Sequence, residues 1–578
     1  MSTIASATNT AMPSTRGLNF FDADPNLAFS VRRHAGAADA ARALPLLHEL
    51  GGIAGDELDA LAMTADRNPP VLRSHDERGE RIDEVIYHPA YVEMQRLGFS
   101  QFGFAAMSHR EGVLGWPGRV PHVVKYALSY LFVQSEFGLF CPISMTDSAA
   151  RVLSQFGPDD LRQRYVPGLT STDMGSLLQS AQLLTERTGG SDVGANECVA
   201  RETASGWEIT GEKWFCSNAG ADVQLTLARP EGGQGGTRGL GMFLVPKVLP
   251  DGSRNRYLIR RLKDKLGSRS MPTGEYEFDG AVGYPVGEIS RGFAQMAEMI
   301  NVSRLSNGMR AAAMMRRSLL EAVVHARGRS AFGRPLAQLP LVREQLFTMT
   351  LDVEAALAIV LYAARALDEA DAGSEVHQRI VRIVTPLIKY AVCKQARQTA
   401  GMAMNLRGGN GYIEEWVNAK LLRDSFLGSI WEGAENVVAI DVARAAGRER
   451  AHDALFADLR ARLTGIRDTD ARREAGLIEA AITVAARRFE GLLAAPTAER
   501  EARMTYLCDR LAALVCATLL VEDADAQARS GEGYRKLLVA SEYRRRYIDR
   551  QDPLDYSDAG VRWLDEVVDW GAVPATAG

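Results

Sequence analysis

Glu432 is the residue whose neighbours in the sequence best suit a chemical role. Trp431 precedes it and Gly433 follows it, in the segment SIWEGAEN. A carboxylate in a dry pocket, where desolvation raises its pKa toward neutrality, can remove a proton from a carbon next to a thioester carbonyl. The aromatic neighbour would supply apolar surroundings, and the glycine would allow close approach. Taken alone, however, the segment would first be interpreted as a surface glutamate.

A glycine turn after Thr185 and Glu186 could bind an anion. The turn has the sequence GGSD and includes Gly190 and Ser191. Two adjacent glycines let the backbone adopt positive φ and direct its N–H groups toward an anion such as a pyrophosphate. Because short motifs give many false matches, a surface turn is the stronger interpretation of the double glycine by itself.

A β hairpin is predicted next to this turn. The segments WEIT (207–210) and KWFC (213–216) have the composition of strands, and Gly211 and Glu212 between them have the composition of a turn. Trp214 would then present its flat indole to a large ring system. Both tryptophans of this stretch could instead be core aromatics.

Two later segments could also contact a cofactor. Arg329 lies three residues before Phe332, which begins a Phe-Gly turn. The guanidinium could hold a pyrophosphate with two hydrogen bonds, and the phenyl ring could stack on an adenine. An arginine at a helix end could equally just interact with the helix dipole. Farther along, Gly408 and Gly409 belong to a glycine-dense loop that could bring backbone against a ligand.

The elements that must position these residues follow from the spacing of apolar side chains. This spacing is near 3.6 from about 88 to 180, close to two from about 182 to 290, and helical again beyond about 291. The predicted fold class is mainly α with an inserted β domain. The expected parts are an N-terminal arm (1–60), an N-terminal helical domain (61–181), a middle β domain (182–290), a helical bundle with Glu432 (291–450) and an additional helical domain (451–578).

The composition limits the classes of protein to consider. The chain has 578 residues, 46% hydrophobic residues, 24% charged residues and a net charge of −5, which describe a globular protein without an overall attraction to nucleic acid or anionic lipid. Its six cysteines lack CxxC spacing, so we expect neither a zinc site nor a disulfide framework. No apolar run approaches the roughly eighteen residues that a membrane span needs, and we expect a cytoplasmic protein.

The motifs, taken in order, resemble the acyl-CoA dehydrogenase family. The relevant segments are TE, GGSD, WEITGEKWFCSN, RSAFGRP, GGNGY and SIWEGAEN. The resemblance implies a helical N domain, a central β-barrel or sandwich, a C-terminal four-helix bundle, a bound FAD, and Glu432 as catalytic base. Cys216 stands where Thr is common, and either it or Ser217 could bond the flavin edge. The implied FAD contacts are Gln182, Leu184, Thr185, Gly190, Ser191, Trp214, Cys216, Ser217, Arg329, Phe332, Gly408, Gly409, Trp431 and Asn436.

The resemblance also implies a reaction and partners. Glu432 would remove a proton α to the carbonyl of an acyl-CoA or related thioester while flavin N5 accepts a hydride from the β carbon, as in fatty acid metabolism. Reduced flavin would pass its electrons to an external acceptor. Arg329 and Phe332 would reach the FAD of a neighbouring subunit, which implies a homo-oligomer, with a dimer of dimers expected and FAD near the interface.

A narrower likeness leads to an alternative function. HPAYVEMQ, CPISMTDSAA and RLKDKLGSRS are similar to the AidB-like branch, which is associated with the response to DNA alkylation and carries an added helical domain. The alternatives are therefore a flavoprotein that binds DNA with little turnover, or a structural flavoprotein that binds a partner protein. Residues 451–578 contain 18 basic and 22 acidic residues, which does not favour DNA binding. We interpret the local cluster Arg544-Arg545-Arg546 as a solvated helix face in preference to a DNA contact.

Overall fold

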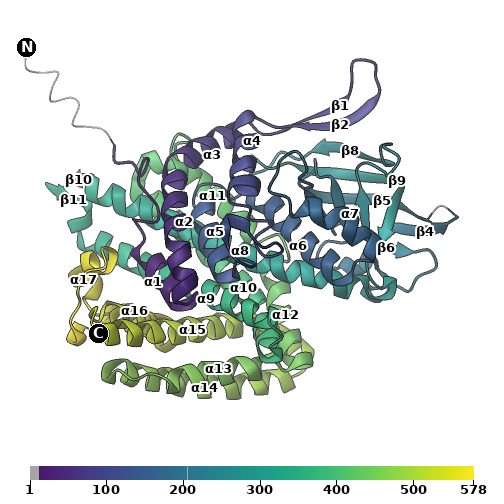
Figure 1. Cartoon of the computed structure of the whole chain (residues 1–578). Coiled ribbons are helices and arrows are strands. Elements are labelled where there is room, and N and C mark those ends of the chain that lie inside the picture. The colour runs from purple at the N-terminus through teal and green to yellow at the C-terminus, as the bar shows by residue number, and fades with distance from the viewer. Residues whose placement is uncertain (1–11, 205, 578) are drawn as a thin grey trace, which may run out of the picture.

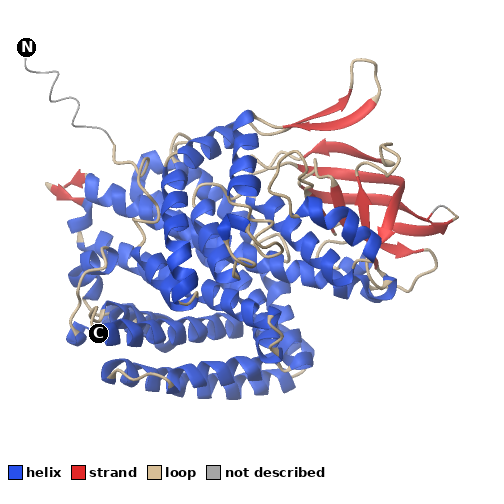
Figure 2. Ribbon diagram, in the orientation of Figure 1, coloured by secondary structure: helices blue, strands red, loops and turns tan. Residues whose placement is uncertain are grey.

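The computed structural model describes residues 12–204 and 206–577. The first eleven residues of the predicted N-terminal arm therefore lie outside the described residues. The described chain is mostly helical, with a β-barrel at one end and a layer of additional C-terminal helices packed under the central bundle (Figures 1 and 2). The predicted fold class is confirmed.

The N-terminal part is a helical layer with one projecting hairpin. Within the segment predicted as an arm, Phe20, Leu27 and Leu47 are fully buried, so these residues form part of the core. The hairpin of β1 and β2 reaches the barrel, where Asp83 pairs with Arg254 at 2.6 Å. The elements are α1 (Pro25–His34), α2 (Ala37–Gly55), α3 (Glu57–Arg67), β1 (Val71–His75), β2 (Arg81–Ile86), α4 (Pro89–Gln95), α5 (His122–Val133), α6 (Phe140–Phe156) and α7 (Asp159–Leu169).

The β domain is a closed barrel, because β6 pairs with both β4 and β7 and the path between them runs through β5 and β9. The β3–β6 and β4–β6 pairs are parallel, and the other pairs are antiparallel. The strands are β3 (Ser180–Leu183), β4 (Val199–Thr203), β5 (Gly206–Ser217), β6 (Val223–Pro230), β7 (Gly241–Pro246), β8 (Tyr257–Leu262) and β9 (Thr273–Pro285).

The predicted hairpin at 207–216 is wrong. These residues form the single strand β5, which pairs with β9 from Trp207 to Ser217 with two register shifts. Gly211 has φ of +141°, and a Cβ there would lie 2.6 Å from the sulfur of Cys198. The glycine therefore permits close packing and a local irregularity within one strand, whereas from the sequence it resembled a turn.

The bundle is built on the long helix α8. Its centre is rich in Ala, Met, Leu and Arg, which are strong helix formers, and it is buried on all sides there. The bundle elements are α8 (Gly292–Gly328), β10 (Ser330–Ala331), β11 (Arg334–Pro335), α9 (Pro340–Asp371), α10 (Glu375–Arg407), α11 (Val417–Gly428) and α12 (Glu435–Glu449). The additional helices are α13 (Ala451–Thr464), α14 (Thr469–Ala494), α15 (Thr497–Ser530), α16 (Arg535–Tyr543) and α17 (Ala559–Val568).

Two helices, α9 and α15, are long and apolar enough to cross a membrane, although the sequence had indicated no such segment. Their most apolar windows are 94% and 72% buried within the structure. Both helices also contact each other and the rest of the bundle. Their apolar character is accounted for by packing in the helical core.

Candidate active site

Glu432 lies in the short loop between α11 and α12. Its φ is +57°, a left-handed conformation that costs about 1–3 kcal/mol for a residue other than glycine. The side chain is only 13% exposed, and its Oε1 accepts a hydrogen bond of 2.5 Å from Ser303 Oγ on α8. Oε2 is buried and has no partner among the described residues. One carboxylate oxygen is thus held in place while the other is free to accept a proton.

Cations from α8 and α10 hold this loop. Arg304 donates from Nε to the carbonyl oxygen of Glu432 at 3.1 Å, and Lys389 donates to the carbonyl oxygen of Gly433. Arg304 also pairs with Asp441 on α12 at 2.5 Å. Since α8 and α10 both bond to the loop and Asp441 of α12 anchors Arg304, the surrounding structure can maintain the strained backbone.

Trp431 lies between aromatic and cationic side chains. Its ring stacks on Phe137 with centroids 5.6 Å apart. The guanidinium of Arg310 lies 4.6 Å from the centroid of Trp431 and 5.2 Å from that of Phe137. Arg310 is 0% exposed, and one of its nitrogens lies 3.7 Å from Glu432 Oε1. A buried positive charge thus adjoins the candidate base.

An apolar cluster joins this loop to the barrel. Trp431 and Leu184 both pack against one cluster of buried residues, whose members include residues of α6, β6, β7 and α8. Gln182 also faces α8, where its Nε2 lies 3.4 Å from the sulfur of Met296. Of the residues predicted to contact a cofactor, Gln182 and Leu184 on the barrel side and Trp431 on the bundle side therefore border one region.

The glycine turn differs from its prediction. Neither Gly189 nor Gly190 has positive φ, so the expected backbone conformation is wrong. A Cβ on Gly189 would lie 2.7 Å from the carbonyl oxygen of Asp192, which shows that close packing requires this glycine. Gly190 and Ser191 are exposed at the tip. These two residues can still approach a ligand from the surface.

A buried ion pair that the sequence analysis did not predict holds the glycine turn against β5. Glu186 pairs with Lys213 at 2.6 Å and also accepts hydrogen bonds from the backbone N–H groups of Glu197 and Cys198. Only the TE motif and the lysine of EKW pointed to these positions in the sequence. The pair contributes to the shape of the turn, since both side chains are buried and fully engaged.

Strand β5 presents some of the predicted residues outward and others inward. The backbone N–H of Trp214 donates to the carbonyl oxygen of Thr185 at 2.9 Å, which ties the strand to the segment before the turn. The indole is partly exposed, with Lys263 Nζ 3.7 Å from its centroid and Arg187 on the ring at 4.8 Å. Ser217 is partly exposed, whereas the side chain of Cys216 is buried in the barrel core. Through its side chain, only Ser217 of this pair can meet a ligand outside the barrel.

Four of the other predicted cofactor contacts lie at a distance from this region: Arg329, Phe332, Gly408 and Gly409. Helix α8 begins against β7 and ends beside Arg329, so its 37 residues separate the barrel from the β10–β11 hairpin by roughly 55 Å. Figure 1 shows this hairpin and the barrel at opposite ends of the molecule. Phe332 at the hairpin tip is 92% exposed with φ of +53°, and Gly408 and Gly409 are exposed at the end of α10. Asn436 is exposed in the first turn of α12, close to Glu432.

The arginine cluster in the C-terminal helices is not a solvated face. Arg544 and Arg546 are buried. Arg544 pairs with Glu474, and Arg546 pairs with Glu344 at 2.7 Å. Arg545 pairs with Glu542 at 2.7 Å. All three guanidinium groups are therefore occupied by internal carboxylates, which leaves this cluster unsuited to contact DNA phosphates.

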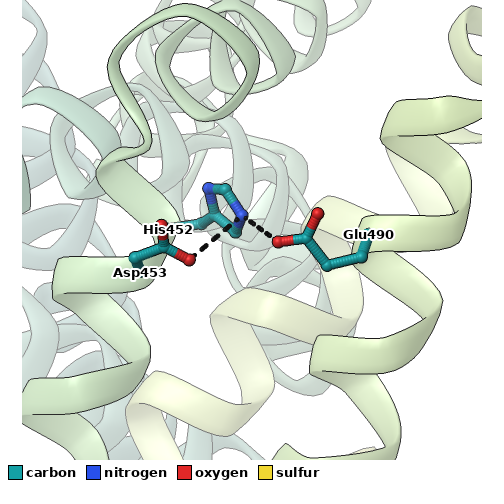
Figure 3. A group of neighbouring side chains, drawn as sticks. All are labelled: His452, Asp453 and Glu490. Carbon is teal, nitrogen blue, oxygen red and sulfur yellow. Dashed lines mark hydrogen bonds and ion pairs between the residues drawn. The ribbon is translucent and has the colours of Figure 1, made fainter.

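A group with ligand-like spacing lies between α13 and α14. Atoms of His452, Asp453 and Glu490 lie within 4.8 Å of one another, and the histidine points at both carboxylates (Figure 3). Arg450 pairs with Asp453 at 2.8 Å and with Glu490 at 3.0 Å. Because this arginine already neutralises both acids, we interpret the group as an ion-pair network between two helices.

Comparison with known proteins gives consistent matches along the chain. Three family models match in succession: the AidB N-terminal domain over residues 10–175, the acyl-CoA dehydrogenase middle domain over 181–281 and the acyl-CoA dehydrogenase C-terminal domain over 290–447. AidB of Escherichia coli (strain K12) is 34% identical over 444 residues, which cover 75% of this chain and 78% of AidB.

Solved structures extend the similarity to the additional helices. Caenorhabditis elegans ACDH-11 in complex with C11-CoA superposes with a TM-score of 0.85 and 27% identity over 96% of each chain. An acyl-CoA dehydrogenase complexed with FAD from Bacillus anthracis shares the fold, with a TM-score of 0.67 and 18% identity over 94% of this chain and 86% of that one.

Proposed function

The chain belongs to the acyl-CoA dehydrogenase family, as its motifs indicate. We therefore propose that it is an FAD-dependent dehydrogenase of CoA thioesters and that Glu432 is its catalytic base. One observation carries the proposal. Glu432 combines a fixed Oε1 with a buried, unpartnered Oε2. It lies in a loop whose strained backbone is held by hydrogen bonds from α8 and α10. This is the arrangement expected of a general base that must accept a proton in one defined direction.

The residues present fit FAD. Gly190 and Ser191 are exposed at the tip of the glycine turn, where their backbone N–H groups can approach a pyrophosphate. The partly exposed indole of Trp214 and hydroxyl of Ser217 lie on the same strand and suit a flavin ring. FAD, when bound, supplies the acceptor for the hydride that leaves the substrate β carbon.

The protein's own part in the reaction can be followed from Glu432. The hydroxyl of Ser303 donates to Oε1 and fixes the carboxylate, so that Oε2 receives the α proton. The backbone N–H of Glu432 has no intramolecular hydrogen bond within the described residues. It is therefore available to donate to the thioester carbonyl oxygen, which would stabilise the negative charge that develops there. Trp431 and Phe137 exclude water from this side of the loop.

Replacement of Glu432 tests the proposed base. In the FAD-loaded protein, Glu432→Gln should slow bleaching of the flavin absorbance by a reactive acyl-CoA by roughly 10²–10⁴-fold, the usual contribution of a general base. The bound FAD and the thermal midpoint should stay as in the wild type, since the amide keeps the shape of the side chain. Equal bleaching rates in the two proteins would contradict the assignment. Failure of every acyl chain length to bleach the wild type would contradict the dehydrogenase function.

We further propose that the FAD of each chain is contacted by residues of a second copy, namely Arg329, Phe332 and the loop at Gly408 and Gly409. The active form would then be a homo-oligomer, and we expect a dimer of dimers. The length of α8 and the high exposure of Phe332 support this, because the hairpin lies far from the barrel of its own chain. An external protein or small-molecule acceptor would then reoxidise the flavin.

The second-copy contact has its own test. Arg329→Ala combined with Phe332→Ala should weaken FAD binding at least about tenfold, because an arginine–phosphate hydrogen bond is lost. The measurement is a fluorescence titration of apoprotein with FAD, together with sedimentation to establish the oligomeric state. Leu554→Ala is a matched control, since Leu554 is 93% exposed but lies in the C-terminal region. A monomeric protein that binds FAD normally would contradict the proposal.

A further inference from the structure

Arg310 has hydrogen-bonding capacity that the rest of the structure leaves unused. Its side chain is completely buried, yet both terminal guanidinium nitrogens lack a partner among the described residues. Only Nε has one, a long contact of 3.4 Å to the carbonyl oxygen of Ser306 in the same helix. Burying a guanidinium without hydrogen-bond acceptors is costly, so its free N–H groups need an explanation, and a ligand that completes the site is one.

The two other largest fully buried arginines, Arg317 and Arg535, do not share this property. Arg317 pairs with Asp59 at 2.7 Å and with Glu321 at 2.9 Å. Arg535 pairs with Glu354 and donates to the carbonyl oxygen of Val567. The fold therefore supplies carboxylates to buried arginines where they serve structure, and it supplies none at hydrogen-bonding distance to Arg310.

The immediate neighbours of Arg310 cannot satisfy its N–H groups. Trp431 and Phe137 offer ring faces, which attract the cation but leave its edge unbonded. Glu432 Oε1, 3.7 Å away, is too far for a hydrogen bond and already accepts one from Ser303. Trp431 Nε1 is a further buried donor without a partner. Donors thus outnumber acceptors on this side of the candidate base.

We propose that Arg310 binds a carboxylate at the far end of the acyl group, so that the substrate is the monothioester of a short dicarboxylic acid. This inference rests on the proposed dehydrogenase function and adds the class of acyl group. A carboxylate matches the forked geometry of a guanidinium and would supply the missing acceptors. An alkyl chain in the same place would leave the terminal N–H groups of the guanidinium buried without hydrogen-bond acceptors.

The position of Arg310 also limits the length of the acyl group. Since its nitrogen lies 3.7 Å from Glu432 Oε1, a carboxylate bound to it must lie close to the carbon from which Glu432 takes the proton. A separation of two to four bonds between that carbon and the carboxylate satisfies both contacts, given carbon–carbon bonds of about 1.5 Å. Acyl groups with four to six carbons have this separation.

Binding of unreactive analogues to the FAD-loaded wild type tests this inference apart from turnover. The probes are CoA thioethers in two pairs of equal carbon number: S-butyl-CoA with S-(3-carboxypropyl)-CoA, and S-pentyl-CoA with S-(4-carboxybutyl)-CoA. Calorimetry measures the dissociation constant of each. We expect the carboxylated probes to bind at least about tenfold more tightly, which corresponds to one good charge-assisted hydrogen bond. Equal or weaker binding of the carboxylated probes would overturn the role of Arg310 and leave the proposed function standing. Binding of no probe at all would overturn both.

Variants at Arg310 localise the effect. Arg310→Met keeps the length of the side chain and removes the charge, so the preference for carboxylated probes should disappear while the alkyl probes bind as well or better. Arg310→Lys keeps the charge and should retain part of the preference. If Arg310→Met leaves the preference of the wild type intact, another residue recognises the carboxylate and the inference is wrong.

Discussion

Arg310 beside the candidate base and Arg535 in the C-terminal helices are both enclosed by the protein, but they use their N–H groups differently. Arg535 directs its guanidinium at Glu354 on α9 and at the carbonyl oxygen of Val567 on α17, where it joins three helices. Burial opposes ionisation of Glu354, but Arg535 and Lys536 together lower its pKa to about 2. A buried charge is therefore structural where the chain completes its hydrogen bonds, and a candidate for ligand binding where it does not.

Methionine substitutions at Arg535 and Arg310 should have the largest difference in effect on stability. Arg535→Met leaves Glu354 with Lys536 as its remaining close cation, and loss of one partner from a buried ion pair should lower the free energy of unfolding by about 3–5 kcal/mol. Arg310→Met removes a charge that has no carboxylate at hydrogen-bonding distance, so the stability should change by less than about 1 kcal/mol or rise. Thermal and denaturant unfolding of the two variants measure this difference. Equal destabilisation would show that the two arginines have the same role.

The pH dependence of stability tests the structural role of Glu354, the partner of Arg535. Because the pKa of Glu354 in the folded protein is about 2, below its ordinary value of 4.5, the folded state binds the proton less tightly than the unfolded state. The contribution of the ionised group is therefore complete above about pH 4.5 and is lost as the pH falls through 2, by about 3 kcal/mol. The stability advantage of wild type over Glu354→Gln should shrink across this range. An advantage that stays constant from pH 6 to 2.5 would contradict the assignment.

A smaller effect is expected from the hydrogen bond between Ser303 and Glu432. Ser303→Ala removes the donor that fixes Oε1, and we expect flavin bleaching by a reactive acyl-CoA to slow about tenfold. Ser303→Thr keeps the hydroxyl and should restore most of the rate, which a purely steric role would not predict. A rate unchanged in Ser303→Ala would show that the carboxylate is positioned without this bond.

The sequence predicted those parts of the molecule that depend on local motifs and their order. The alternation of helical and strand-like spacing gave the fold class, and the SIWEG segment indicated Glu432 and Trp431. The structure adds that both side chains are partly buried and that Glu432 has a strained backbone. The predicted FAD contacts stay predictions, although Gln182, Leu184 and Trp431 do border one apolar cluster.

Features that depend on tertiary packing could not be predicted. Gly211 and Glu212 resemble a turn in the sequence. A glycine that is needed to make room for Cys198 cannot be distinguished there from a glycine that reverses the chain. Ser303 and Arg310 are ordinary members of a helix until that helix is placed against Glu432. A single arginine in the stretch GMRAAAMM was the one available sign, since burying it among alanines and methionines requires a partner.

Helix α8 carries Ser303 and Arg310 in its interior and ends beside Arg329. One helix therefore holds side chains next to Glu432 of its own chain and also the hairpin proposed to contact the neighbouring chain. Substitutions next to Glu432 and substitutions in the hairpin of the same chain would then affect different active sites of the oligomer. In a mixed dimer of one Glu432→Gln subunit and one subunit altered at Arg329 and Phe332, the first site would carry both defects and the second neither. Two impaired proteins, once allowed to exchange subunits, should together regain one intact centre per mixed pair.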